Sequence, residues 1–284
     1  MRRAAVRVLV GGVALAAVAA CSGGSSSGGK PPSAAATGDQ TVIVATPRTD
    51  ASTDQLEAAA TVLSKRFAGL GVKASIDTGL SPGGTSTLKV SVTPQDVAAA
   101  KFLITEQGLL EVRRVLDARS KPAQRCRNNS KAFPASEMSS GDAVLCDPAD
   151  GLILLLAPAA LDQGDIASAS ASETAIATAT AGSGWQVTFK LTASGATSWR
   201  TLTEAAYAAT GSADAGFGSC HPPRGCNAFA FVIDGATVEV ASSPSTGGIP
   251  GDLAGIFGFQ EPVAKRLVAT VNSGPLPVAL TVNG

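Results

Sequence analysis

The chain has 284 residues, with 22 Lys or Arg and 22 Asp or Glu, so its formal net charge is zero. It has no basic stripe of the kind that neutralises nucleic-acid phosphates, and we do not expect nucleic acid as a partner. Hydrophobic residues are 45% of the chain and aromatic residues only 4%, so its core must rest on Ala, Val, Leu and Ile, in one large domain or two small ones.

Residues 1 to 20 have the pattern of a lipoprotein signal peptide. Three arginines, Arg2, Arg3 and Arg7, precede an apolar stretch from Val8 to Ala20, and small residues stand directly before Cys21. The stretch has about 13 residues, whereas a helix needs ~20 to cross a bilayer, so we expect it to be cleaved. The sequence therefore predicts lipidation of Cys21, palmitate included, and a lipid anchor on the extracytoplasmic face of the cell membrane. The alternative is an ordinary secretory signal in which Cys21 is incidental.

Residues 21 to 39 predict a flexible linker. They are rich in Gly, Ser and Ala and hold almost no bulky apolar side chain, so they cannot build a core. A chain of this length and composition has an end-to-end distance of ~25 Å. We expect it to hold the folded part close to the membrane.

Residues 40 to 118 predict the order strand, helix, strand, strand, helix, strand. This βαββαβ order is typical of the ferredoxin-like arrangement, in which two helices cover one face of a four-stranded antiparallel sheet. The fold class expected is therefore α+β. The elements are predicted at 41–45, 52–70, 72–76, 88–92, 93–107 and 110–116.

Capping residues mark both helix starts. Ser52 and Gln55 can form a capping box, in which each side chain satisfies a free N–H of the first turn. At the second start Thr93 is expected to cap with its side chain, and Pro94 has the φ angle wanted at the first helical position.

Four cysteines remain after Cys21. An even number in an exported chain predicts disulfides, and the alternative of four free thiols is disfavoured in an oxidising compartment. Four cysteines allow three pairings, and the sequence does not choose among them. We favour the local pairs Cys126–Cys146 and Cys220–Cys226, because each pair lies inside one polar loop segment. The first pair would close a polar insertion at residues 119–149.

Residues 150 to 258 predict a second α+β unit. Strands are expected at 152–156, 174–181 and 185–191, and a hairpin at 229–240 turns at Asp234-Gly235. After this unit, Pro262 begins a last helix that Gly274 ends, and a strand follows at 276–282. Two helix faces are predicted from apolar spacing: Ala196, Trp199, Leu202 and Ala206; and Val263, Leu267, Val268 and Val271.

Residues 168 to 182 alternate small side chains without a large one. One interpretation is an edge strand able to pair with an extended guest chain. The other is a spacer or an ordinary strand of a sheet.

No motif predicts catalysis, a cofactor or a metal. Gly24 to Gly28 match the G-x-S-x-G pattern of hydrolases, but they lie in the linker without the strand and helix that the motif needs. His221, the only histidine, lies between Cys220 and Pro222, and we expect it to be a solvated residue beside a disulfide. Four acidic residues stand singly, with solvation or turn formation as their expected role: Glu204, Asp214, Asp234 and Asp252. We therefore predict that the protein is not an enzyme.

Six short segments, in order, resemble elements of the first extracytoplasmic domain of SecD, an accessory subunit of the Sec preprotein translocase. Each is weak alone. They are Arg66–Val72, Leu109–Arg113, Leu161–Ala169, the Asp-Gly hairpin of Phe231–Pro244, Gly247–Gly258, and the helix and Leu-Pro strand of Val263–Leu280.

The resemblance implies a base, residues 40–118 plus 259–284, interrupted by a head at 150–258. In that family further transmembrane helices, together with SecF, couple export to proton flow, and we expect no such helices in this chain. We therefore expect a lipid-anchored protein that assists export by binding emerging polypeptide or Sec translocase subunits, without proton coupling. The alternative is a structural or binding lipoprotein of the envelope that reuses the fold outside the Sec pathway.

Overall fold

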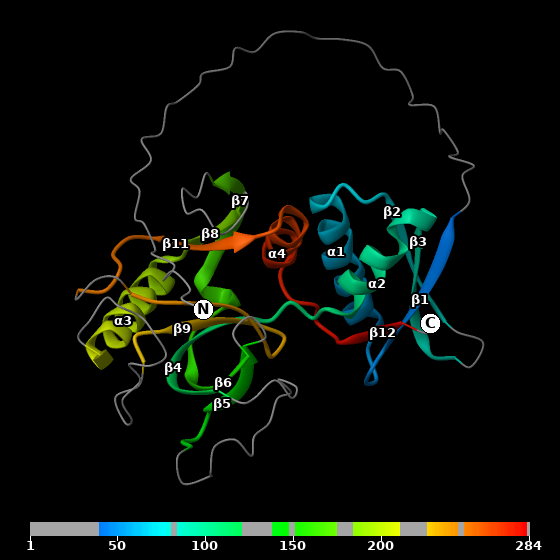
Figure 1. Cartoon of the computed structure of the whole chain (residues 1–284). Coiled ribbons are helices and arrows are strands. Elements are labelled where there is room, and N and C mark those ends of the chain that lie inside the picture. The colour runs from blue at the N-terminus through cyan, green and yellow to red at the C-terminus, as the bar shows by residue number, and fades with distance from the viewer. Residues whose placement is uncertain are drawn as a thin grey trace.

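The structure is a computed structural model that describes residues 40–80, 84–120, 138–147, 151–174, 184–210, 226–243 and 247–282. Two lobes lie side by side, as Figure 1 shows. We call the lobe built on sheet β12-β1-β3-β2 the base, and the lobe built on the other two sheets the head.

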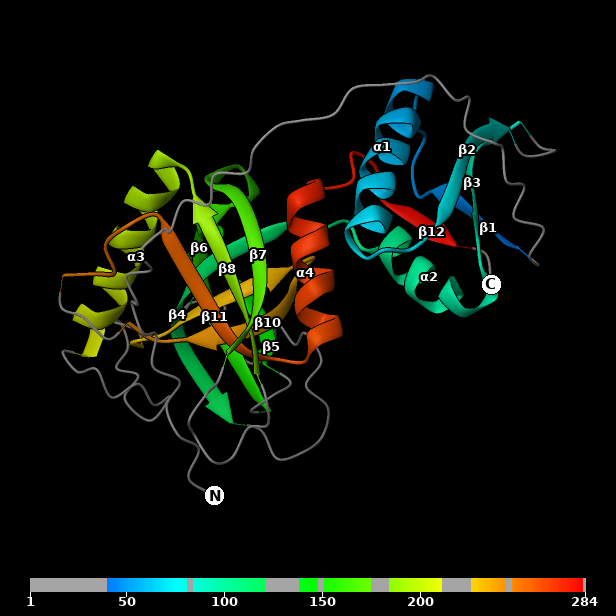
Figure 2. The same cartoon turned by 90° about the horizontal axis from the view of Figure 1, so that it is seen from above.

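The base is a four-stranded antiparallel sheet with two helices on one face (Figure 2). Its buried side chains, such as Leu63, Val90 and Leu103, form one apolar cluster between the helices and the sheet. The elements are β1 (Thr41–Pro47), α1 (Thr53–Gly69), β2 (Ala74–Leu80), β3 (Ser86–Val92), a 3-10 turn (Pro94–Asp96), α2 (Val97–Thr105) and β12 (Leu280–Val282).

The first five elements of the predicted βαββαβ order are confirmed, but the prediction that Leu110–Leu116 completes the base sheet is wrong. This segment forms β4 (Leu110–Ser120), which pairs with β6 and β9 of the head. The fourth place in the base sheet is taken by β12, which pairs with β1 antiparallel. The apolar pattern of a strand predicts that the strand is buried, but it does not predict which sheet the strand joins.

The head contains two antiparallel sheets. The five-stranded sheet has the order β10-β9-β4-β6-β5 and the three-stranded sheet the order β11-β8-β7. Their other strands are β5 (Ala143–Asp147), β6 (Leu152–Asp162), β7 (Ile166–Thr174), β8 (Gly184–Leu191), β9 (Phe229–Ile233), β10 (Ala236–Ala241) and β11 (Leu253–Phe259).

The five-stranded sheet curls until its edge strands, β5 and β10, contact each other. The register of β4 against β6 shifts around Arg113, Val115 and Asp117, and such irregularities bend a strand and increase its twist. A small apolar cluster with Val115 and Leu154 takes side chains from all five strands, so it fills the concave side.

The opposite face of this sheet packs on the three-stranded sheet, α3 (Ala193–Thr210) and α4 (Glu261–Ser273). Aromatic side chains mark the centre of this core. Trp199 meets Phe229 edge-on with ring centroids 5.0 Å apart, and Phe189 stacks on Phe231 at 5.6 Å. The predicted α3 face is confirmed, because Trp199, Leu202 and Ala206 are buried there.

The predicted face of α4 points into the head core and not into the base. Leu267 and Val271 are buried in the head's main cluster, and Val263 and Val268 pack against it. The helix begins at Glu261 with Pro262 in its first turn and ends before Gly274, as the sequence predicts. Helix α4 therefore lies between the lobes, and the strand after it belongs to the base.

The two predicted helix caps differ in outcome. Ser52 and Gln55 form the capping box, with N···O distances of 2.9 and 3.2 Å. Thr93 makes no side-chain bond to the helix backbone and donates to the Asp96 carboxylate at 2.6 Å. A carboxylate three residues on competes for the hydroxyl, so the predicted Thr93 cap is wrong.

Inside the predicted polar insertion the structure has the strand β5, which sequence reasoning missed. Most of the strand predicted at 174–181, the whole N-terminal segment with Cys21, and Cys126, Asp214, Cys220 and His221 lie outside the described residues. Within the described residues, no helix has both the length and the apolar character needed to cross a membrane.

Candidate functional site at the junction of base and head

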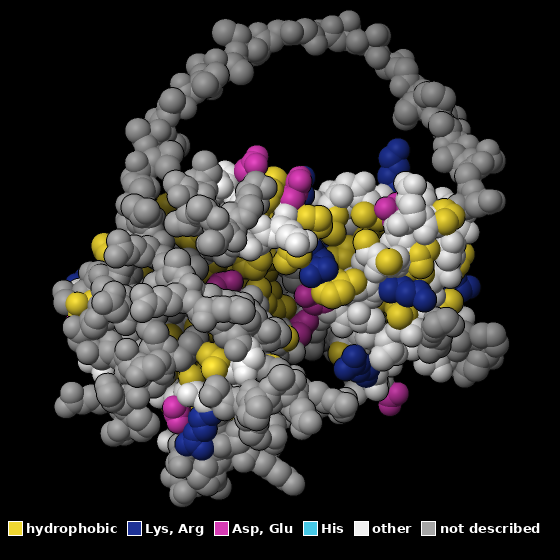
Figure 3. All heavy atoms as spheres, viewed as in Figure 1, with side chains coloured by type: hydrophobic (Ala, Val, Ile, Leu, Met, Phe, Trp, Pro, Cys, Tyr) yellow, Lys and Arg dark blue, Asp and Glu magenta, His cyan; other side chains and the backbone are white. Residues whose placement is uncertain are grey.

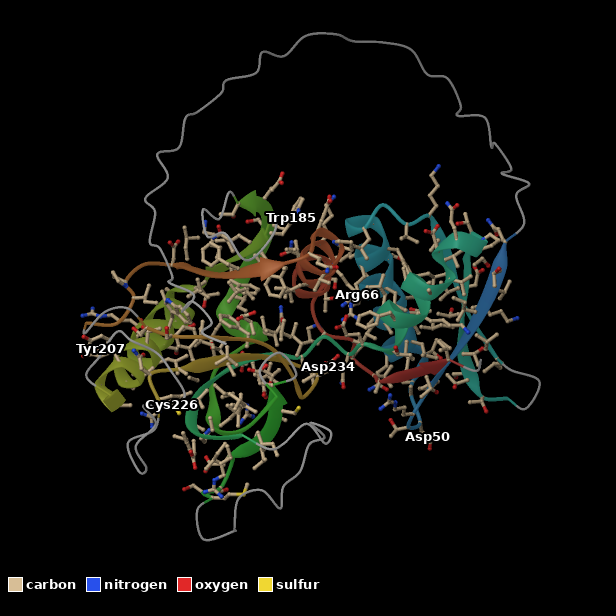
Figure 4. The ribbon with its side chains drawn as sticks, viewed as in Figure 1. Asp50, Arg66, Trp185, Tyr207, Cys226 and Asp234 are labelled. Carbon is tan, nitrogen blue, oxygen red and sulfur yellow. The ribbon has the colours of Figure 1, made fainter. Side chains whose placement is uncertain are left out.

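The chain crosses between the lobes twice, at residues 106–109 on the way into the head and at 274–276 on the way back. The crossings lie side by side, because the Leu276 N–H donates to the Gln107 carbonyl at 2.8 Å. Figure 4 shows Arg66 and Asp234 between the two lobes at this place. In Figure 3 hydrophobic side chains gather where the lobes meet, with charged side chains among them.

Arg66, from the last turn of α1, ties both crossings together. Its side chain is fully buried, with 0% exposure. Every N–H of its guanidinium is used, which is the full donor capacity of an arginine. The acceptors are Ser273 Oγ at 3.1 Å, the carbonyls of Leu103 at 3.0 Å, Gln107 at 2.9 Å and Gly274 at 3.1 Å, and the carbonyl of Glu106.

Carbonyls and a hydroxyl, and no carboxylate, bind this buried cation directly. Burial lowers the pKa of Arg66, while the charges of Glu106 and Asp234 raise it. An arginine stays protonated under these conditions. The positive charge is therefore stabilised mainly by backbone dipoles that belong to the two crossings.

Glu106 stands at the start of the first crossing, close to this cation. Thr270 of α4 donates to its carboxylate at 3.2 Å. Burial raises the pKa of Glu106, and the nearby Asp234 adds to the rise. The hydrogen bond from Thr270 and the charges of Arg266 and Arg66 act in the opposite direction.

Asp234 fastens the β9–β10 hairpin of the head to the first crossing. Its carboxylate accepts from the N–H groups of Gly108 at 3.0 Å and Leu109 at 2.8 Å, and its own N–H donates to the Leu109 carbonyl at 3.0 Å. Asp234 has a φ of 50° and Gly235 of 73°, as in the predicted tight hairpin turn. Gly108 has a φ of 83°, and a Cβ there would overlap the Arg66 guanidinium.

Helix α4 adds two side-chain contacts with the base. The Arg266 guanidinium lies over the Phe102 ring, 3.9 Å from its centroid. A Cβ built on Gly69 of α1 would lie 3.1 Å from Cβ of Ala269, so a small residue is needed where α1 and α4 approach.

Sequence reasoning missed the role of this junction. From the sequence, Arg66 belongs only to a SecD-like segment and Asp234 only to a turn. The turn is confirmed. The structure adds that the Asp234 carboxylate binds the N–H groups of the first crossing. Glu204 lies exposed on α3 and Asp252 is exposed before β11. Cys146 lies on β5 and Cys226 just before β9, so both belong to the head. In the described part of the chain, no group of three His, Cys, Asp or Glu could hold a metal ion.

A second concave feature lies on the head. A groove of about 350 Å³ runs between α3 and the second half of β6, and most of its wall is apolar. Arg114 supplies its charge, and Pro158, Thr201 and Leu202 line it.

Comparisons with known proteins identify the fold. No protein-family model and no curated protein matches the chain. A crystal structure of SecDF in its super-membrane-facing form matches 86% of this chain with a TM-score of 0.55 at 23% identity, and the chain spans 29% of the length of that structure. A second structure, of a SecDF described as a membrane component that enhances protein export, matches 86% of this chain and 98% of its own length, with a TM-score of 0.51 at 23% identity. The described residues thus form an α+β fold of four helices and three antiparallel sheets that resembles this part of SecDF, and the predicted fold class is confirmed.

Proposed function

We propose that this protein is a lipid-anchored, extracytoplasmic SecD-like protein that assists protein export by binding emerging polypeptide or the Sec translocase. The likeness of its fold to a structure of SecDF, matched over 98% of the length of that structure, carries the proposal. That SecDF is described as enhancing protein export.

The proposal assigns a binding role without proton coupling. The larger SecDF structure is matched over only 29% of its length, so the likeness covers one part of that protein. The described residues here form two lobes, and the head carries a mostly apolar groove between α3 and β6 that another chain can enter. A catalytic role is not proposed.

Attachment to the membrane through Cys21 is part of the proposal. It is supported by the basic, apolar and small-residue order of residues 1 to 21 and by the polar linker that follows. The anchor would keep the two lobes beside the membrane, on its extracytoplasmic face. Cys126–Cys146 and Cys220–Cys226 are the disulfides we propose for that compartment.

In-cell crosslinking tests the binding role. A photoreactive amino acid is placed at Thr201 on the groove or Ser172 on β7, both exposed on the head, and at Ser75 of β2 on the base as the matched control. We expect the two head positions to capture newly exported polypeptides or a subunit of the translocase. Capture only of envelope proteins at all three positions would contradict the proposal and favour an envelope role outside the Sec pathway.

A further inference from the structure

Strand β2 is an edge strand of the base sheet, with β3 on one side only. Its seven residues pair with β3 without a shift of register. Edge strands of natural proteins are usually very short, bulged or covered, because an open row of N–H and C=O groups binds other strands. None of these three protections applies to β2 in the described part of the chain.

The other edge strands of the described residues are each protected. Strand β12 has three residues, β5 and β10 contact each other, and β11 has an irregularity between Ile256 and Phe259. Strand β7, for which the sequence allowed a guest strand as one interpretation, is covered by α4, whose Asn272 binds the Ala169 backbone. Among the described strands, β2 therefore provides the open edge.

Helix α1 covers one face of β2 and leaves its edge open. Ala74 and Ile76 pack against the base core on the helix side, whereas Ser75 and Asp77 are exposed on the opposite face. Figures 1 and 2 show α1 and α2 on the same face of this sheet. In the described part of the chain the hydrogen bonds of β2 go to β3, and no other element binds its backbone.

Lys73 and Asp77 make this edge complementary to itself. Each lies two residues from Ser75, and exposure alternates from Lys73 to Asp77, so the three side chains share one face. Neither charge has a salt bridge within the described residues. If an antiparallel copy of β2 is added with Ser75 opposite Ser75, Lys73 of each copy lies opposite Asp77 of the other.

The charges select this register over its neighbour. Opposite charges that face each other across two strands attract, and like charges in this position repel. A two-fold axis at Asp77 would place the two Asp77 carboxylates opposite each other. An axis at Ser75 forms two attractive pairs and no repulsive one.

We propose that two copies of this chain join through β2, antiparallel and with Ser75 opposite Ser75, into one continuous sheet of both bases. The occupant of the edge is a second copy because a two-fold axis brings the same surface of two subunits together, and this surface matches itself. The inference goes beyond the proposed function and does not depend on it.

The start of the described chain suits such a dimer. Thr41 of β1 and Ala74 of β2 both pair with Val92 of β3, so β1 begins level with the two-fold axis. Five strand spacings of ~4.8 Å separate the two β1 strands, which is about 24 Å. Each preceding linker has a reach of ~25 Å, so both copies can be attached to one membrane.

Cysteine crosslinking tests the register. The protein is the mature chain with Cys21→Ser, which carries no lipid, and Ser75→Cys is added. Residues directly opposite have Cβ atoms about 5 Å apart, so we expect mild oxidation to give a disulfide-linked dimer. Ser91→Cys is the matched control, because Ser91 lies opposite Ser75 on β3 and would be about 14 Å from its equivalent. No crosslink at Ser75, or equal crosslinking at both positions, would overturn the inference.

Charge reversal tests the pairing of Lys73 with Asp77 by analytical ultracentrifugation. Asp77→Lys turns both attractions into repulsions, and we expect the dimer dissociation constant to rise about tenfold. Lys73→Asp combined with Asp77→Lys restores opposite charges and should return the constant to within about threefold of the parent value. Asp50→Lys, the same charge change at an exposed residue outside β2, is the control and should leave the constant unchanged.

Two results of this experiment would overturn the inference. One is a parent protein that stays monomeric up to about 1 mM. The other is a double variant that associates as weakly as Asp77→Lys alone. In cells, a photoreactive residue at Ser75 should capture a second copy of the chain. Capture of a different protein there, with no dimer in solution, would show that another strand occupies the edge and would also overturn the inference.

Discussion

At the scale of single residues, Arg66 shows how one side chain can hold two distant segments together. It is buried, and the acceptors of its N–H groups come from residues 103–107 and 273–274. Its place on a helix could be predicted from the spacing around it. Its burial could not, because an arginine in a helix is normally solvated and the acceptors lie up to 208 positions away.

Replacing Arg66 by leucine should destabilise the protein by about 3–5 kcal/mol. The change leaves the buried carbonyls of both crossings without donors, a cost of the size found when a buried polar network loses one member. Urea unfolding of the two proteins measures the difference. Lys65→Leu, the exposed neighbour, is the control and should change stability by no more than about 0.5 kcal/mol. An equally small effect at Arg66 would show that the junction can reorganise without it.

Glu106 should make the protein less stable as the pH rises. Its pKa is raised in the folded state, mainly by burial, so the folded state binds the proton more tightly than the unfolded state. The ionised Glu106 carboxylate lowers the free energy of unfolding. This loss is absent at a pH below the pKa of the unfolded state and complete at a pH above the pKa of the folded state. Glu106→Gln should therefore raise the unfolding midpoint at pH 7, and the gain should vanish in acid. A gain that is equal at both pH values would contradict this assignment.

At the scale of elements, local signals predicted helices better than sheet membership. The capping box of Ser52, the proline of α4 and the Asp234-Gly235 turn each act within a few residues, so the sequence carries them. Strand partners depend on distant segments. Strand β4 was expected in the base sheet but pairs with strands of the head, and β12 occupies the place in the base sheet that was expected for β4. Strand β5 was missed because it is short and stands among polar residues.

Helix α3 is held by Trp199, which lies against two phenylalanines of β9. Trp199→Ala should cost about 3–5 kcal/mol, as expected for removing a buried aromatic side chain. Thr197→Ala, exposed on the same helix, is the matched control. Thermal unfolding of both variants gives the comparison. If the two midpoints fall alike, the contacts of Trp199 with β9 do not account for the loss, because alanine is a better helix former than either residue that it replaces.

At the scale of the whole molecule, the α+β class and the likeness to a part of SecDF could be predicted, because short motifs in the right order indicate a fold even where overall identity is only 23%. The junction could not be predicted as a site. It is made of backbone carbonyls, which every sequence has, and only the fold brings them to one arginine.

The mature protein should carry both the lipid on Cys21 and the two proposed disulfides. Its intact mass should show residues 21 to 284 plus lipid, and reduction should add about four hydrogen masses when two disulfides open. The Cys21→Ser variant should be released from the membrane fraction. A mass that reduction does not change would contradict the disulfides, and a Cys21→Ser protein that stays on the membrane would contradict the anchor.

The contact between Gln107 and Leu276 has a further consequence for how such a protein can change. The segment between these two residues starts and ends at neighbouring points of the base. Deleting the segment therefore leaves two chain ends that are already in contact. A short turn could rejoin them, and the sheet β12-β1-β3-β2 would keep its strand order. The larger lobe is in this sense a cassette, and any lobe exchanged for it has to supply acceptors for the Arg66 N–H groups that Ser273 and Gly274 bind here.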